Sequence, residues 1–173
     1  GIASAVLMKV LYAARVARFD FLKPIAALAT KVTKWTKLCD RQLHRLICYV
    51  QSTLDLFMYG WIGDGPGELD LVLYSDADLA GDQADCKSAS GIFLCVMGHR
   101  SSMPIAAVSK KQSAVAKSTP EAEIVATDRG LSPEALPVLH VCEMLFGGET
   151  RIKLPEDNTA ACKIVIAGKN PDM

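Results

Sequence analysis

The chain has 173 residues, half of them apolar, which is enough for one domain or for one domain with a helical appendage. Its 19 Lys and Arg residues balance 19 Asp and Glu residues, so no global basic field indicates nucleic acid, and any such contact must be a local patch. No apolar run approaches the ~18 residues of a membrane span, so we expect none.

The six cysteines are isolated from one another along the chain. No C-x-x-C pair occurs, so neither a zinc ribbon nor a thioredoxin-like motif is supported. Most lie in apolar surroundings, where a free cysteine behaves as a small buried hydrophobe. We therefore expect reduced, structural thiols, which suit an intracellular protein. The positions are Cys39, Cys48, Cys86, Cys95, Cys142 and Cys162.

The first third of the sequence is helical in pattern. Helices are predicted over residues 2–18, 20–33 and 36–53, and the third has the clearest apolar spacing. Residues 1–18 contain no Asp or Glu, which is also compatible with a targeting segment. The turn cluster 63–67 (Gly-Asp-Gly-Pro-Gly) then predicts a boundary near residue 62. We expect a helical segment, 1–62, and a second domain, 63–173.

Three strands are predicted next, over residues 69–74, 91–97 and 103–109. The first is apolar on both faces, which is typical of a central strand, and it ends in the polar run Ser75-Asp76-Ala77-Asp78. Residues 98–100 make a tight hairpin between the second and third strands. Strands joined by short links should be antiparallel neighbours.

A long helix is predicted from about residue 119 to 145, with a break near 130–133 where Gly130 and Pro133 fall. Its start is either a Thr119 cap with Pro120 following, or a capping box of Ser118 with Glu121.

A strand over residues 151–154 and a final helix capped by Asn158 complete the order β-β-β-α-β-α. The crossover helix should make the fourth strand parallel to the first and place it beside it. The fold class predicted is α/β, with a mixed sheet.

Three carboxylates stand where a metal site could form. Asp76 follows the first strand, Asp157 follows the fourth, and Glu123 is expected with Glu121 in the first turn of the long helix. Parallel neighbouring strands would bring the two aspartates to one end of the sheet, and a helix packed across them would bring Glu123 close. Two divalent cations need bridging carboxylates of this kind, and Mg²⁺, or Mn²⁺, suits oxygen ligands.

Ordinary explanations exist for each of these residues. Asp residues at strand ends often cap the backbone, and Glu121 suits the dipole at a helix start. Lys110, Lys111 and Lys117, which follow the third strand, could contact phosphate or simply form a solvated face.

Several ordered motifs resemble the ribonuclease H domain of copia-type retrotransposon polyproteins. Residues 1–62 resemble the helical connection that follows the reverse transcriptase, with Ala17-Arg18-Phe19-Asp20 and Tyr49-Val50-Gln51-Ser52-Thr53 as landmarks. The motifs of the second domain are Tyr74-Ser75-Asp76-Ala77-Asp78-Leu79-Ala80-Gly81-Asp82, Lys87-Ser88-Ala89-Ser90-Gly91, Ser109-Lys110-Lys111-Gln112, Ser118-Thr119-Pro120-Glu121-Ala122-Glu123, Glu156-Asp157-Asn158 and Gly168-Lys169-Asn170-Pro171.

The resemblance implies a ribonuclease H-like fold with a mixed five-stranded sheet. It implies hydrolysis of the RNA strand of RNA–DNA hybrids with two Mg²⁺ ions held by Asp76, Glu123 and Asp157. It also implies a fourth acidic or histidine ligand beyond the Lys-Asn-Pro stretch. No residue of this chain matches that ligand by motif, so we expect the 63–173 domain to be truncated at its C-terminal end.

Two functions remain open from the sequence. The first is an endoribonuclease of the ribonuclease H type, with an RNA–DNA hybrid as its partner. The second is the same fold without catalysis, serving as a structural or interaction subunit with protein partners in a larger assembly. A hybrid binder that does not cleave is a further alternative.

Overall fold

The computed structural model describes residues 2–82 and 85–168, which form two compact units, Gly1–Met58 and Tyr59–Met173. The units divide slightly before the predicted boundary at residue 62. Of the last sequence motif, residues 169–171 lie outside the described residues. All six cysteines are free, and no helix among the described residues is long and apolar enough to cross a membrane.

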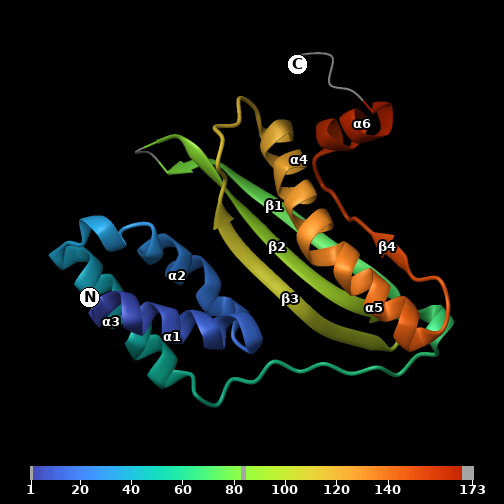
Figure 1. Ribbon diagram of the computed structural model, residues 1–173, viewed down its shortest axis with the longest axis horizontal. Helices are drawn as coiled ribbons and strands as arrows, with labels where there is room; N and C mark the ends of the chain where they lie inside the picture. Colours follow the sequence, from blue (N-terminus) through green and yellow to red (C-terminus); the bar gives the residue numbers. More distant parts are fainter. Residues whose placement is uncertain (1, 83–84, 169–173) are drawn as a thin grey trace. The chain divides into compact units, whose positions relative to one another are not determined.

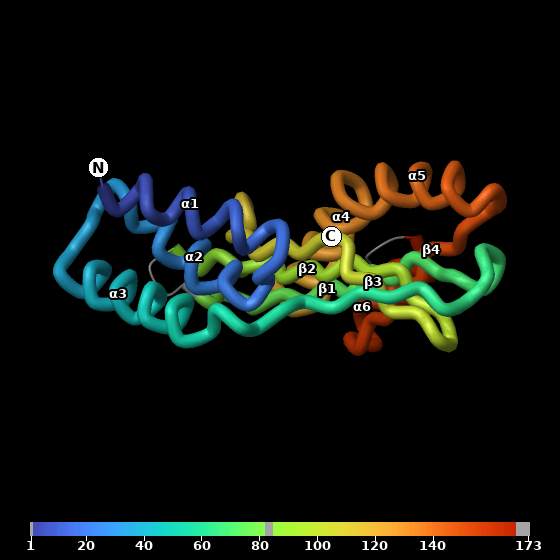
Figure 2. Tube along the Cα trace, turned by 90° about the horizontal axis from the view of Figure 1, so that it is seen from below, coloured from blue at the N-terminus to red at the C-terminus, as the bar shows by residue number. Residues whose placement is uncertain are grey.

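The first unit consists of α1 (Ile2–Val16), α2 (Leu22–Ala29) and α3 (Lys37–Ser52), joined by short 3₁₀ turns. Figure 2 shows α2 lying between the other two helices. Each helix has a buried stripe at helical spacing, as the periodicity predicted. The buried residues are Leu7 and Ala14 on α1, Leu22, Ile25 and Leu28 on α2, and Cys39 and Leu46 on α3.

Arg18 joins the two ends of this helical unit. Its guanidinium donates to the carbonyl oxygen of Thr53 at 2.7 Å and to its hydroxyl at 2.8 Å. The same group forms a bidentate pair with Asp20 and lies 4.0 Å above the ring centroid of Phe21. Because planar guanidinium contacts of this kind are directional, they fix the end of α1 against the end of α3.

The second unit is built on a four-stranded mixed sheet of order β3-β2-β1-β4 (Figure 1). The strands are β1 (Asp70–Asp82), β2 (Lys87–Gly98), β3 (Ser101–Lys111) and β4 (Arg151–Lys153). The first three are antiparallel neighbours, and β4 runs parallel to β1. The predicted order and directions are therefore confirmed, and the fold class is α/β.

Strand β1 is longer than predicted, so Asp76 lies within the strand and not after its end. Residues Ser75–Asp78, expected after the strand end, continue the antiparallel pairing with β2. Asp76 and Asp78 are exposed, so they remain hydrated while their backbone groups are paired. A polar run can be a strand when its side chains face solvent, because the ladder satisfies the backbone regardless of side-chain type.

The turn cluster at residues 63–67 is held against the β2–β3 hairpin by Asp64. Its carboxylate accepts hydrogen bonds from the Arg100 amide and the Ser101 hydroxyl, each at 2.6 Å. The Ser101 hydroxyl in turn accepts from the Gly63 amide at 2.9 Å. The bond from Ser101 lowers the pKa of Asp64 below its usual value. These bonds fix where the chain enters β1.

One face of the sheet is covered by a nearly continuous helical segment (Figure 1). It consists of α4 (Thr119–Gly130), a π-helical turn (Leu131–Ala135) and α5 (Leu136–Phe146), and it contains the predicted break. In the π turn the Leu136 amide bonds to the Leu131 carbonyl, an i→i+5 step that accommodates Pro133 within the helix. A shorter helix, α6 (Thr159–Ala167), is capped by Asn158 as predicted.

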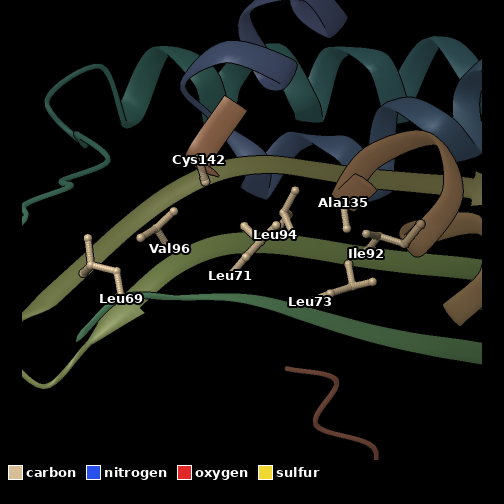
Figure 3. Packing of buried hydrophobic residues seen from close by; sticks show 8 residues of the cluster. All are labelled: Leu69, Leu71, Leu73, Ile92, Leu94, Val96, Ala135 and Cys142. Carbon is tan, nitrogen blue, oxygen red and sulfur yellow. The ribbon is translucent and has the colours of Figure 1, made fainter. Parts of the chain in front are cut away.

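Figure 3 shows the core between the sheet and these helices. Leucines at alternate positions of the β1 segment and apolar residues at alternate positions of β2 point toward the π turn and α5, as the two-residue period of a strand requires. The cluster comprises Leu69, Leu71, Leu73, Ile92, Leu94, Val96, Ala135 and Cys142.

Gly130 lets the end of α4 approach the sheet. A Cβ placed there would lie 3.0 Å from Leu73 Cδ1 and 3.3 Å from Ile92 Cγ2. We predict that Gly130→Ala destabilises the protein by about 1 kcal/mol, because overpacking of about 1–3 kcal/mol exceeds the gain of up to about 1 kcal/mol in helix propensity.

Urea denaturation of the starting protein and of Gly130→Ala measures the difference in unfolding free energy. Gly67→Ala is the control, because a Cβ at that position meets nothing within 4 Å. Its unfolding free energy should stay within about 0.5 kcal/mol of the starting protein. A Gly130→Ala variant as stable as Gly67→Ala would contradict the close approach.

Candidate metal-binding acidic site

Glu123 is the centre of the candidate site. The structure confirms Ser118 as the helix cap, since its hydroxyl accepts from the Glu121 amide at 3.4 Å. Helix α4 therefore begins at Thr119, and Glu123 lies beyond the first turn, in which only Glu121 remains. The prediction that both glutamates lie in the first turn is wrong for Glu123. Capping and the helix dipole do not explain an acid at this position.

The carboxyl group of Glu123 is buried without full hydrogen bonding. The residue is 5% exposed, and its Oε2 atom has no hydrogen-bond partner among the described residues. The backbone of Ala77 in β1 acts to lower the pKa of this carboxyl group, but less strongly than burial raises it. A buried, incompletely paired acid costs free energy, so a folding role alone does not account for it.

Three further carboxylates surround this group. Burial, and then the negative charges of Asp76, Glu156 and Asp157, raise the pKa of Glu123 from 4.5 to about 7. The charges of Asp76 and Asp157 therefore act on Glu123, although the three acids come from β1, from α4 and from the segment before α6. Glu156, which stands beside Asp157 in the same sequence motif but was not predicted as a site residue, acts on Glu123 by its charge as well.

The strand arrangement opens this edge of the sheet. Strand β4 pairs with β1 only from Asp70 to Val72, so the later half of β1 has no strand neighbour on that side in the described residues. The chain then turns through Glu156, whose carboxylate accepts the Asn158 amide at 3.0 Å and precedes α6. Helix α6 packs against α4. Asp157, just before α6, is thus held near enough to α4 for its charge to act on Glu123.

Within residues 2–82 and 85–168, no group of three or more His, Cys, Asp or Glu side chains is arranged so that it could hold a metal ion as it stands. Asp76 and Asp157 are exposed, whereas Glu123 is buried. Their assignment as metal ligands stays a prediction.

Two polar bridges hold α4 on the sheet on either side of Glu123. The Gln112 amide group is buried and donates to the Ser90 hydroxyl and to the Ala122 carbonyl, each at 3.0 Å. One turn further along α4, the hydroxyls of Ser75 and Thr127 lie 2.9 Å apart. These bridges tie the helix to β1 and β2 next to the acidic residues.

The sequence motifs contained Gln112, Ser75 and Ser90 but gave them no role. A glutamine between a strand and a cap has no periodicity that marks it as buried. Its position directly after two lysines was the only feature that marked it, and that position is equally typical of a solvated loop.

The three lysines predicted to contact substrate differ in their environments. Lys110 and Lys117 are exposed. Lys111 forms a salt bridge of 2.8 Å with Asp85. The Lys117 backbone amide donates to Glu121 at 2.7 Å, which fixes the loop before α4. Their role toward a substrate stays a prediction.

No protein-family model, curated protein or solved structure matches the chain.

We predict that Glu123→Gln stabilises the metal-free protein above pH 7. Between about pH 4.5 and 7 the folded state keeps a proton that the unfolded state loses, so stability falls as pH rises through this window. Glutamine has no charge to desolvate, so the variant should gain about 1–3 kcal/mol at pH 8 and little at pH 4. Urea denaturation in EDTA at both pH values measures the gain.

Glu121→Gln is the matched control, because it removes the same charge two residues away, in the first turn of α4. It should gain nothing at pH 8, since Glu121 accepts the Lys117 amide and suits the helix dipole. Equal pH dependence in wild type and Glu123→Gln would contradict the buried, repelled carboxylate.

We also predict that Gln112→Ala destabilises the protein by about 1–3 kcal/mol. The change leaves the Ala122 carbonyl and the Ser90 hydroxyl without this partner in a buried place, and an unpaired buried group costs that much. The exposed Gln51, changed to Ala, is the control and should stay within about 0.5 kcal/mol. Coinciding denaturation curves for the two variants would contradict the role of Gln112 as a bridge between the sheet and α4.

Proposed function

We propose that this chain is a ribonuclease H-like nuclease of copia-type retrotransposon origin that hydrolyses the RNA strand of RNA–DNA hybrids. The observation that carries the proposal is the buried Glu123, whose Oε2 atom has no partner among the described residues and whose pKa is raised by burial and by the charges of Asp76, Glu156 and Asp157. Nuclease sites of this kind consist of carboxylates gathered from separate elements.

The residues fit a hard divalent cation by their donor chemistry. Glu123 offers a desolvated oxygen that lacks a partner, and Asp76, Asp157 and Glu156 bring further carboxylates to the same place. Mg²⁺ prefers oxygen ligands and is bound through one or two carboxylates with water and substrate phosphate completing the shell. We propose Asp76, Glu123 and Asp157 as the ligands.

Bound divalent cations would supply a nucleophilic water and stabilise the leaving oxygen at neutral pH. The chain's own residues have positioning roles. Gln112 and the Ser75–Thr127 pair keep Glu123 against β1, and Lys110 and Lys117 stand exposed next to this region, where they can contact the hybrid backbone. Recognition would use hybrid shape and 2′-hydroxyls rather than base sequence.

The competing proposal is a non-catalytic module that uses the same fold to bind protein partners. It predicts that the carboxylates bind no divalent cation and that no hybrid is cut. The two proposals therefore separate on metal binding and cleavage together.

We predict that the protein cuts the RNA strand of a hybrid with Mg²⁺ or Mn²⁺, leaving 3′-hydroxyl and 5′-phosphate ends. Asp76→Asn, Glu123→Gln and Asp157→Asn should each lower the rate by more than about 100-fold, because each removes a proposed ligand. Gel analysis of an end-labelled hybrid measures cutting, and calorimetric titration with Mn²⁺ measures cation binding.

Asp128→Asn is the control, since it removes an exposed carboxylate from the same helix as Glu123. It should keep both activity and cation binding. Absence of both Mn²⁺ binding and cutting in the starting protein would reject the nuclease and favour the non-catalytic module. Cutting that survives all three acid substitutions would reject this site.

A further inference from the structure

The net charge of the whole chain is zero, but its two units carry opposite net charges. Residues Gly1–Met58 contain nine Lys and Arg against three Asp and Glu, a net charge of +6. Because the whole chain is neutral, residues 59–173 carry −6. The acidic site therefore lies in an acidic unit, and a basic field belongs to the helical unit alone. A charge asymmetry of this kind between two parts of a chain indicates a polyanionic partner for the basic part.

The basic charge is ordered along one face of α3. Lys37, Arg41 and Arg45 follow one another at four-residue intervals, so they turn by only about 40° per step and span about 12 Å. All three are exposed, and Lys34 stands exposed just before the helix. The buried Leu46 lies nine residues from Lys37, on the opposite side of the helix. One face of α3 is thus core and the other is cationic.

These three cations have no partner within the described residues. In the part of the chain that the structure describes, Lys37, Arg41 and Arg45 form no salt bridge and no side-chain hydrogen bond. Arg18 in the same unit is the contrast, because it is bound to Asp20 and Thr53. A stripe of free cations raises the local positive potential and needs no rearrangement before it meets an anion.

A groove of about 360 Å³ adjoins this stripe between α2 and α3. Leu28 and Leu46 contribute apolar surface to it, while Lys31 and Arg45 add cationic groups and Tyr49 adds a half-exposed ring. Cationic groups beside an apolar and aromatic surface suit a sugar-phosphate chain, whose phosphates and sugars or bases need different contacts.

We propose that the α3 face of Lys37, Arg41 and Arg45, with the adjoining groove, binds the sugar-phosphate backbone of a nucleic acid. Over about 12 Å a duplex presents three or four phosphates per strand, which three cations can contact together. The surface contains no base-reading pattern, so the binding is independent of sequence.

A membrane surface is the less favoured polyanion. A helix that lies on a membrane needs an apolar face that enters the lipid, beside its basic residues. The apolar residues Cys39 and Leu46 of α3 are buried in the protein, and the exposed Leu38 beside Arg45 is a single apolar side chain rather than a continuous apolar face. This face can therefore contact phosphates but has no apolar face to insert into lipid.

This inference does not rest on the proposed nuclease activity, because its residues lie in the other unit and need no divalent cation. The test uses the full chain in EDTA, with fluorescence anisotropy of a labelled RNA–DNA hybrid, a DNA duplex and a single-stranded RNA from 50 to 200 mM salt. Phosphatidylserine vesicles at equal phosphate concentration form the fourth arm.

The variant is Lys37→Gln/Arg41→Gln/Arg45→Gln. Removing three phosphate contacts should weaken binding at least about tenfold at 100 mM salt and reduce the slope of log K against log salt by about 3. The matched control, Lys9→Gln/Arg15→Gln/Lys23→Gln, removes the same charge from exposed positions of α1 and α2 and should keep the slope near that of the starting protein. Circular dichroism checks that both variants remain folded.

Equal losses in the two triple variants would overturn the site, since net charge alone would then explain binding. No binding by the starting protein in EDTA would also overturn it, as would tighter binding to vesicles than to any nucleic acid. The relative affinities for hybrid, duplex and single strand identify which backbone is preferred. Glu123→Gln should bind as the starting protein does without cutting, so failure of the nuclease proposal and failure of this one are separate results.

Discussion

The second unit depends on one unfavourable arrangement: the carboxyl group of Glu123 is buried among other negative charges. Burial and repulsion both oppose its ionisation, so folding alone gives no reason to keep an acid there. The surrounding contacts hold it in place. Gln112 bridges β2 and α4 on one side, and the Ser75–Thr127 pair joins β1 to α4 on the other. The helix therefore cannot easily move to release the carboxyl group into water.

The order of elements could be predicted from the sequence because it depends on local patterns. Apolar periodicity marked the helices, turn residues separated them from the strands, and the crossover rule made β4 parallel to β1. The extent of β1 could not be predicted in the same way. Polar residues such as Asp76 look like a strand end in the sequence, and only the pairing with β2 shows that the strand continues.

The candidate site was predicted by residue type but not by environment. Asp76, Glu123 and Asp157 could be named because acids at these spacings suit a metal site. The cap at Ser118 rather than Thr119, a one-residue difference that no pattern decided, places Glu123 beyond the first turn, and the packing of α4 against β1 and β2 buries it. The bridging role of Gln112 depends on how a loop folds over a helix. Such contacts are tertiary, and single-sequence patterns carry no information about them.

Charge is distributed along this chain in a way that gives the two proposals a common physical basis. A nucleic acid approaching the −6 unit is repelled by the same carboxylates that would hold a cation, so the acidic unit alone is a poor binder of polyanions. Divalent cations at Glu123 would remove part of that repulsion, and the free cations of α3 would supply attraction that the acidic unit lacks. Binding to the helical unit should therefore be strongest at low salt and should need no divalent cation, whereas engagement of the acidic unit should require divalent cations.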